Sequence, residues 1–208
     1  MDPKRMVEEG YDRIARRYAE WASGGDEVRA WFLDEVLQRL PAGAAILELG
    51  CGSGTAAAAL ADGRSYTGVD LSAAQLAMAQ ERHPDLTFLR GDLTSIWFRD
   101  GAFDAVVAFW VFNHVPRAEQ GPTFERIHRW LRPGGRLMLS LGADDTDDEV
   151  QDNFLGVPMF FAGFEPNANE RSLRDAGFEL ELSETRSQIE EGEGEATFHW
   201  VIARKPPT

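Results

Sequence analysis

A glycine-rich turn at residues 48–55, with the sequence ELGCGSGT, has the clearest chemical meaning in this chain. It lies between an apolar run typical of a buried strand and an alanine-rich run typical of a helix. Glycines let a backbone turn tightly and approach a ligand, and the start of a helix offers unpaired N–H groups. The glycines are spaced G-x-G-x-G, whereas a dinucleotide loop has G-x-G-x-x-G. The turn is therefore a ligand-binding loop of another kind or an ordinary tight turn.

Two acidic residues follow the next two predicted strands. Asp70 ends the run YTGVD, twenty residues after Gly50, where a carboxylate can accept both hydroxyl groups of a ribose. A helix N-cap or a plain surface acid is the alternative for Asp70. Asp92 follows the third predicted strand in the run RGDL, either within reach of an adenine amino group or in a simple turn.

His114 is the histidine best placed for chemistry. It stands in the run WVFNHVP at residues 110–116, directly after the fourth predicted strand. An imidazole titrates near neutral pH and can act as a general base, although it can also shape a pocket through a hydrogen bond alone. We expect the other three histidines to be structural, and Cys51 to be a small filler in the glycine turn. The sequence holds no Cys/His cluster with ligand spacing, so we predict no metal site.

The elements that must position these residues alternate between short apolar runs and helical patterns. Five predicted strands span residues 45–49, 65–69, 86–89, 103–109 and 136–141. Strands that alternate with helices are typical of a parallel sheet covered on both faces. Two later extended segments, 178–185 and 196–204, lie too close together for a helical crossover and should pair antiparallel. The predicted fold is an α/β, Rossmann-like, seven-stranded, mostly parallel sheet with an antiparallel C-terminal hairpin.

Two helical segments precede this sheet. Tyr11, Ile14, Tyr18 and Trp21 recur at helical spacing and form one apolar stripe. We predict an N-terminal helical cap at residues 1–40 on a single domain at 41–208. The apolar segment 154–164 contains glycines and a proline, so we expect a lid loop within residues about 142–166 that covers an acceptor pocket. The alternative is a satellite core that holds the N-terminal helices down.

The composition excludes several classes of protein. The 208 residues include 21 basic and 35 acidic ones, for a net charge of −14, and one cysteine. Such a charge argues against nucleic-acid binding, and residues 141–195 alone carry −13, mostly as solubilising surface. The start MDPKRMVEEG has no apolar signal region, and no apolar run is long enough to span a membrane. We expect a cytoplasmic protein with no membrane partner. The sequence makes no prediction about its oligomeric state.

Five motifs stand in the order and spacing of a known family. ILELGCGSGT, YTGVDLS, GDL, FDAVVAFWVFNHV and LRPGGRLMLS, within residues 44–141, resemble class I S-adenosylmethionine-dependent methyltransferases of the small-molecule type. The N-terminal YDRIARRYAEW and the terminal hairpin are similar to that family as well. The resemblance implies in-line methyl transfer from S-adenosylmethionine to O or N of a small acceptor, leaving S-adenosylhomocysteine. The alternatives are a cofactor-binding regulatory protein without transfer activity and, against the loop spacing, an NAD(P)-dependent oxidoreductase.

The resemblance also implies roles for individual residues. Those expected around the methionine part of the cofactor are Glu48, Gly50, Gly52 and Gly54. Asp70 would hold the ribose, Leu71 would contact the adenine, and Asp92 would accept from the adenine amino group beside the Leu93 N–H. The remaining residues expected at the cofactor are Cys51, Phe109, Tyr11 and Tyr18.

The acceptor pocket is expected in the apolar segments around the catalytic candidate His114. The residues that we expect to line it are Trp21, Trp110, Asn113, Phe154, Met159, Phe160 and Phe161. Family members that methylate nucleic-acid or protein amide nitrogens carry Asn/Asp-Pro-Pro-Tyr/Phe after the fourth strand. This chain has NHVP there, so the partner that we expect is a small molecule.

Overall fold

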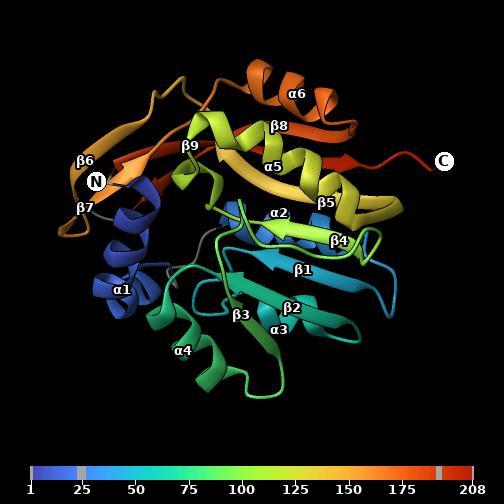
Figure 1. The fold of residues 1–208 in the computed structure, drawn as a ribbon, viewed down its shortest axis with the longest axis horizontal. Helices are drawn as coiled ribbons and strands as arrows, with labels where there is room; N and C mark the ends of the chain where they lie inside the picture. The colour runs from blue at the N-terminus through green and yellow to red at the C-terminus, as the bar shows by residue number, and fades with distance from the viewer. Residues whose placement is uncertain (1, 23–26, 191–193, 208) are drawn as a thin grey trace.

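Seven strands form one central sheet in the order β3–β2–β1–β4–β5–β9–β8 (Figure 1). The computed structural model describes residues 2–22, 27–190 and 194–207. Strands β1 to β5 run parallel, and β9 runs antiparallel to both β5 and β8. The strands are β1 (Ala45–Leu49), β2 (Ser65–Asp70), β3 (Thr87–Arg90), β4 (Phe103–Ala108), β5 (Leu131–Gly142), β8 (Glu179–Glu190) and β9 (Gly194–Arg204). The predicted fold class is confirmed.

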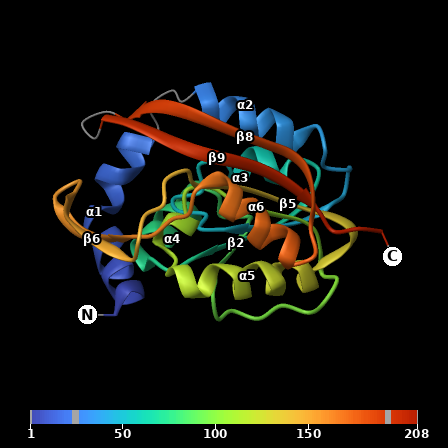
Figure 2. The ribbon, with the colours of Figure 1, turned by 90° about the horizontal axis from the view of Figure 1, so that it is seen from above.

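Helices cover both faces of this sheet, with α2 and α3 on one side and α5 and α6 on the other (Figure 2). The helices are α1 (Pro3–Ala22), α2 (Glu27–Leu37), α3 (Ala57–Ala61), α4 (Ala73–Arg82), α5 (Arg117–Trp130), α6 (Pro166–Asp175) and the 3-10 turn η1 (Phe112–His114). In the part of the chain that the structure describes, no helix is long and apolar enough to span a membrane.

Alternate residues of the central strands face the two helical layers, because successive side chains of a strand point to opposite sides. In β1, Leu47 and Leu49 belong to the core beneath α5 and α6, whereas Ile46 belongs to the core beneath α2 and α3. In β9, Val201 belongs to the core beneath α5 and α6, whereas Trp200 belongs to the core beneath α2 and α3. A sheet buried on both faces needs apolar side chains at nearly every position, which explains the continuous apolar runs of the sequence.

The two N-terminal helices pack in different places, so the predicted cap at residues 1–40 is divided. Helix α2 buries Phe32 and Val36 in the same core as Trp200 of the sheet. Helix α1 contacts α4 and a separate hairpin, made of β6 (Glu149–Phe154) and β7 (Val157–Phe161). Figure 1 shows α1 beside the carboxyl ends of the parallel strands. Helix α1 therefore lies where a cap over a ligand site would lie, whereas most of α2 packs on the sheet.

The segment predicted as a lid loop is the β6–β7 hairpin, so the prediction of an irregular loop was wrong. Leu155 and Gly156, with φ angles of 49° and 89°, make its tight turn. Pro158 is tolerated within β7 because both strands of a two-stranded hairpin are edge strands. A proline in an edge strand can face away from the partner strand, where no backbone hydrogen bond is needed. The hairpin buries Phe160 and other apolar side chains against Ile14 of α1.

Loss of the Phe32 ring tests the attachment of α2 to the sheet. Phe32 is fully buried, and its ring centroid lies 4.9 Å from that of Trp200. We expect Phe32→Ala to lower the free energy of unfolding by about 3–5 kcal/mol, because a large buried side chain leaves a cavity. Urea denaturation measures this loss. The control is Trp97→Ala, at a ring that is 77% exposed, and an equal loss in both variants would contradict the packing described for α2.

Candidate active site

The glycine turn is held in a conformation that only glycine adopts easily. Gly50, Gly52 and Gly54 have φ angles of 69°, 52° and 74°. The N–H groups of Gly50 and Cys51 both donate to the Val69 carbonyl, at 2.8 and 3.0 Å, which ties the turn to β2. A Cβ atom added to Gly50 would lie 2.6 Å from the Val111 side chain. The turn therefore passes tightly against the segment that follows β4.

The Asp70 carboxylate is fixed by backbone donors at the end of β2. Its Oδ2 accepts from the Gly52 N–H at 2.8 Å, and its Oδ1 accepts from the Ser72 N–H at 2.9 Å. Burial raises the pKa of Asp70, and these backbone hydrogen bonds oppose the rise. Because each carboxylate oxygen has more than one acceptor position, both can still accept from a ligand.

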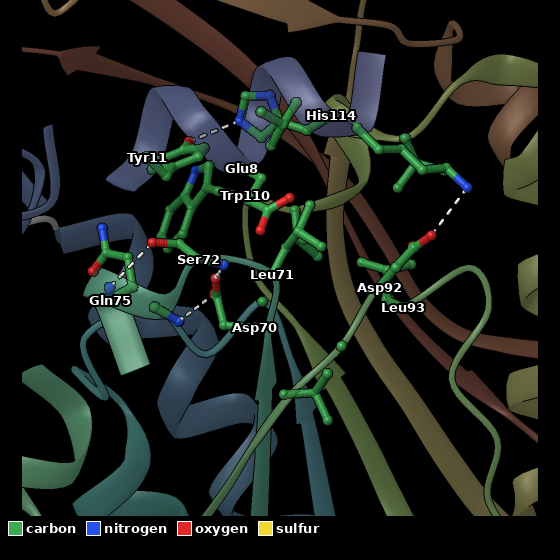
Figure 3. Close-up of a pocket in the computed structure, with 18 of the residues that line it drawn as sticks. Glu8, Tyr11, Asp70, Leu71, Ser72, Gln75, Asp92, Leu93, Trp110 and His114 are labelled. Atoms are coloured by element: carbon green, nitrogen blue, oxygen red, sulfur yellow. Dashed lines mark hydrogen bonds and ion pairs between the residues drawn. The ribbon is translucent and has the colours of Figure 1, made fainter. Parts of the chain in front are cut away.

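One cavity gathers most of the residues predicted to hold a cofactor (Figure 3). Nine of them line it, namely Gly50, Gly52, Asp70, Leu71, Asp92, Leu93, Phe109, Tyr11 and Tyr18. Figure 3 shows Asp70 and Asp92 on opposite sides of this cavity with Leu71 between them. Residues from β1, β2, β4 and α1 thus surround one space, as expected at the carboxyl edge of a parallel sheet.

Three of the predicted cofactor residues lie outside the lining of this cavity. The Glu48 side chain accepts a hydrogen bond from the Tyr66 hydroxyl. Burial raises the pKa of Glu48 to about 7, against the effect of the Tyr66 hydroxyl. Cys51 is buried, and burial raises the pKa of its thiol. The carbonyl of Gly54 faces α4 and lies 3.0 Å from His83 Nε2. These three residues belong to the glycine turn but do not line the cavity.

Helix α1 reaches into the cavity through polar side chains that the sequence analysis did not single out. Lys4 Nζ lies 3.0 Å from Asp92 Oδ2 and 2.5 Å from Glu119 Oε2. Thr94 donates to Asp92 Oδ1 from its backbone N–H and its hydroxyl, both at 2.8 Å. Burial alone would raise the pKa of Asp92, but the bonds from Thr94 and Lys4 lower it. No local pattern connects Lys4 with Asp92, because 88 residues separate them.

His114 is held at both ring nitrogens. Its Nδ1 lies 2.8 Å from the Phe160 carbonyl oxygen, which can only accept, so Nδ1 carries the proton. Its Nε2 is then an acceptor, and it accepts a hydrogen bond from the Tyr11 hydroxyl at 2.8 Å. Asn113 Nδ2 lies 3.5 Å from the same nitrogen. Burial lowers the pKa of His114 to about 4, although the hydrogen bond to the Phe160 carbonyl acts to raise it. At neutral pH the ring is therefore uncharged, with its basic nitrogen toward Tyr11.

A second cavity of about 740 Å³ adjoins the first. Five of the residues predicted for the acceptor pocket line it, namely Trp21, Trp110, Asn113, Phe154 and Phe161. Met159 and Phe160 do not line it, because both side chains are buried between the hairpin and α1. The sequence analysis missed the contribution of α2 and β9, which add Arg29 and Phe198. Neither has a local signal that points to this space.

Four side chains line both cavities and separate them: Tyr11, Tyr18, Trp110 and His114. Trp110 has a φ angle of 49°, which is a strained conformation for a bulky residue. Its backbone N–H donates to Ser140 Oγ at 2.8 Å. The Arg29 guanidinium lies 4.3 Å from the centre of the Trp110 ring. Within residues 2–22, 27–190 and 194–207 there is no group of His, Cys, Asp or Glu that could hold a metal ion.

Comparisons with known proteins agree with this arrangement. Residues 46–135 match the family described as "Methyltransferase domain". The chain is 34% identical over 138 residues to a demethylmenaquinone methyltransferase of Beutenbergia cavernae, covering 62% of this chain and 55% of that protein. It is 34% identical over 163 residues to a probable S-adenosylmethionine-dependent methyltransferase of Mycolicibacterium smegmatis, covering 74% of this chain and 62% of that protein. The chain thus spans less than two thirds of these relatives.

The fold is also that of solved methyltransferase structures. The magnesium protoporphyrin IX methyltransferase of Synechocystis with bound S-adenosylmethionine superimposes with a TM-score of 0.75 and 19% identity, covering 99% of this chain and 98% of that chain. At this identity the likeness concerns the fold alone.

Adding a methyl group at Gly50 tests the contact with Val111. We expect Gly50→Ala to lower the free energy of unfolding by about 2–4 kcal/mol, from backbone strain and from the clash. Gly43→Ala is the matched control, because Gly43 has a φ of 72° with nothing within 4 Å of an added Cβ. Urea denaturation should show a smaller loss there. In a Val111→Gly background, which removes the Val111 Cβ as well as its methyl groups, the cost of Gly50→Ala should fall to that of Gly43→Ala, and an unchanged cost would contradict the clash.

The pKa of His114 predicts a pH dependence of stability. The folded-state pKa of about 4 lies below the ordinary histidine pKa of 6.5. Between these values the unfolded chain binds a proton that the folded chain does not, so the free energy of unfolding falls as the pH falls. The slope from this group is at most about 1.4 kcal/mol per pH unit. Denaturation of wild type and His114→Gln from pH 7 to 4 should show a shallower fall in the variant. Parallel curves would refute the assignment.

Proposed function

This chain belongs to the class I S-adenosylmethionine-dependent methyltransferases, and on that premise we propose that it binds S-adenosylmethionine and methylates O or N of a small-molecule acceptor. The observation that carries the proposal is the junction of the two cavities. A cleft built from the glycine turn and Asp70 adjoins an aromatic cavity, and His114 lines both.

The residues of the first cavity fit the cofactor chemically. S-adenosylmethionine would supply an activated methyl group on a sulfonium centre. The bare backbone at Gly50 and Gly52 allows a close approach, and the fixed carboxylate of Asp70 can accept from ribose hydroxyls. Asp92 would share its oxygens between Lys4 and an adenine amino group. Phe109 and Leu93 line the same space and would offer backbone groups.

His114 is proposed as the general base for acceptors that lose a proton. The bond from Nδ1 to the Phe160 carbonyl fixes the tautomer and the orientation of the ring, so that Nε2 remains basic. The Tyr11 hydroxyl already donates to Nε2 and is the group through which a proton from the acceptor can reach the imidazole. The low pKa of His114 keeps the ring uncharged at neutral pH, so that it can accept a proton. The same low pKa makes the ring a weak base, so the proposed role applies to acceptors that lose a proton readily.

The second cavity is proposed as the acceptor site, closed by α1 and the β6–β7 hairpin as a lid. One wall of this cavity is aromatic, with Trp21, Phe154 and Phe161, and the remaining lining is largely polar or charged. This combination favours an acceptor that has both an apolar or planar part and a polar part. The relatives support a small-molecule acceptor but name different ones. The Beutenbergia protein is named for demethylmenaquinone, and another relative, at 31% identity, is named for arsenite.

Removal of the imidazole tests the catalytic proposal. We expect His114→Ala to lower turnover by about 10²–10⁴-fold, because a positioned base contributes that much, while the Kd for S-adenosylhomocysteine changes little. Transfer of labelled methyl groups to a panel of phenols, naphthoquinols and amines measures turnover, and calorimetry measures the Kd. His128→Ala, on α5 and outside both cavities, is the control.

Two outcomes would count against the proposal in different ways. Unchanged turnover of His114→Ala on an accepted substrate would remove His114 from the mechanism while leaving methyl transfer intact. Binding of S-adenosylmethionine by wild type without transfer to any acceptor would favour a cofactor-binding protein without transfer activity.

A further inference from the structure

Gln75 is a buried polar residue whose side-chain amide lies at the edge of the first cavity. It lies in the first turn of α4, is 1% exposed and lines the first cavity. Its backbone N–H donates to Ser72 Oγ at 3.1 Å, in the cap of the helix. Neither Nε2 nor Oε1 of its side chain has a hydrogen-bond partner among the residues that the structure describes.

An amide in this position is costly for the protein alone. Buried donors and acceptors in folded proteins are almost always paired, because an unpaired group has lost its hydrogen bonds to water without replacement. A glutamine side chain offers two N–H donors and a carbonyl acceptor, so it can pair with a ligand in both directions. The open side of Gln75 faces a cavity, which suggests that a ligand supplies these partners.

The position of Gln75 relative to Asp70 indicates which part of a ligand it meets. Gly52 lies between the two: its N–H donates to Asp70 Oδ2 at 2.8 Å, and a Cβ added to it would lie 3.9 Å from Gln75 Oε1. In Figure 3 the Gln75 amide lies beside Ser72, on the side of the cavity away from Asp92. The amide and the Asp70 carboxylate therefore border the same end of the cavity.

We propose that Gln75 is a second ligand of the ribose, which pairs with the 1,2-diol beside Asp70. The inference rests on the proposed function and extends it. A diol presents two hydroxyl donors and two acceptor oxygens, whereas an ionised carboxylate can only accept. Asp70 accepts a hydrogen bond from one hydroxyl group. The Gln75 Nε2 donates to a hydroxyl oxygen, and its Oε1 accepts from a hydroxyl group. The pair distinguishes a ribose from a deoxyribose.

Replacement of the amide by an apolar side chain of similar length tests this inference. We expect Gln75→Met to weaken the binding of S-adenosylhomocysteine by about tenfold, the value of one or two lost hydrogen bonds. The same variant should raise the melting temperature of the unliganded protein, because a buried unpaired amide is removed. Gln80→Met, at an exposed position of α4, is the matched control and should leave both quantities unchanged. A glutamine that only stabilises the fold would lower the melting temperature when replaced.

The 2′-deoxy and 3′-deoxy analogues of S-adenosylhomocysteine identify the contact by calorimetry. For at least one analogue, wild type and Gln75→Met should bind with equal affinity, because the hydroxyl group that Gln75 contacts is missing. Equal affinity of the two proteins for S-adenosylhomocysteine itself, or the same loss for all three ligands, would overturn the inference while the proposed function stands. Failure of wild type to bind S-adenosylhomocysteine would overturn both.

Discussion

The chain of hydrogen bonds from the Tyr11 hydroxyl through the His114 ring to the Phe160 carbonyl holds the site together. It joins α1, η1 and β7, three elements that are far apart in sequence. Because a neutral imidazole has one donor and one acceptor, both are used, and the ring is fixed in one tautomer and one orientation. The wall between the two cavities and the orientation of the proposed base depend on these two bonds, which add to the apolar packing of α1 against the hairpin.

The carboxyl edge of the sheet gathers several buried ionisable and amide groups. Glu48, Gln75 and His114 are buried within one region, and Asp70 beside them is half-buried. Burial shifts the pKa of both acids and of the histidine toward the uncharged form. Such groups cost stability in the unliganded protein, and proteins accept this cost mainly where a ligand or a reaction uses the groups.

Much of the fold could be predicted because a doubly covered parallel sheet leaves a strong local pattern. The apolar runs of β1 and β4 are continuous, since both faces of these strands are buried. The hairpin at residues 149–161 was missed because a proline and a glycine argue against regular structure, yet an edge strand tolerates the first and a tight turn requires the second. The apolar residues of α1 and α2 indicate helices, but they do not say which surface will cover each helix.

The sequence by itself determined which residues stand at the working edge of the sheet. All parallel strands end at the same edge, so the residues after β1, β2, β3 and β4 had to meet there, the glycine turn, Asp70, Asp92 and His114 among them. Only the tertiary structure decided their partners: Lys4 beside Asp92, and the Phe160 carbonyl and the Tyr11 hydroxyl at His114. Strand and turn patterns arise from sterics between near neighbours in the chain. The partners of His114 lie 46 and 103 residues away, and only the packing of whole elements brings them within hydrogen-bond distance.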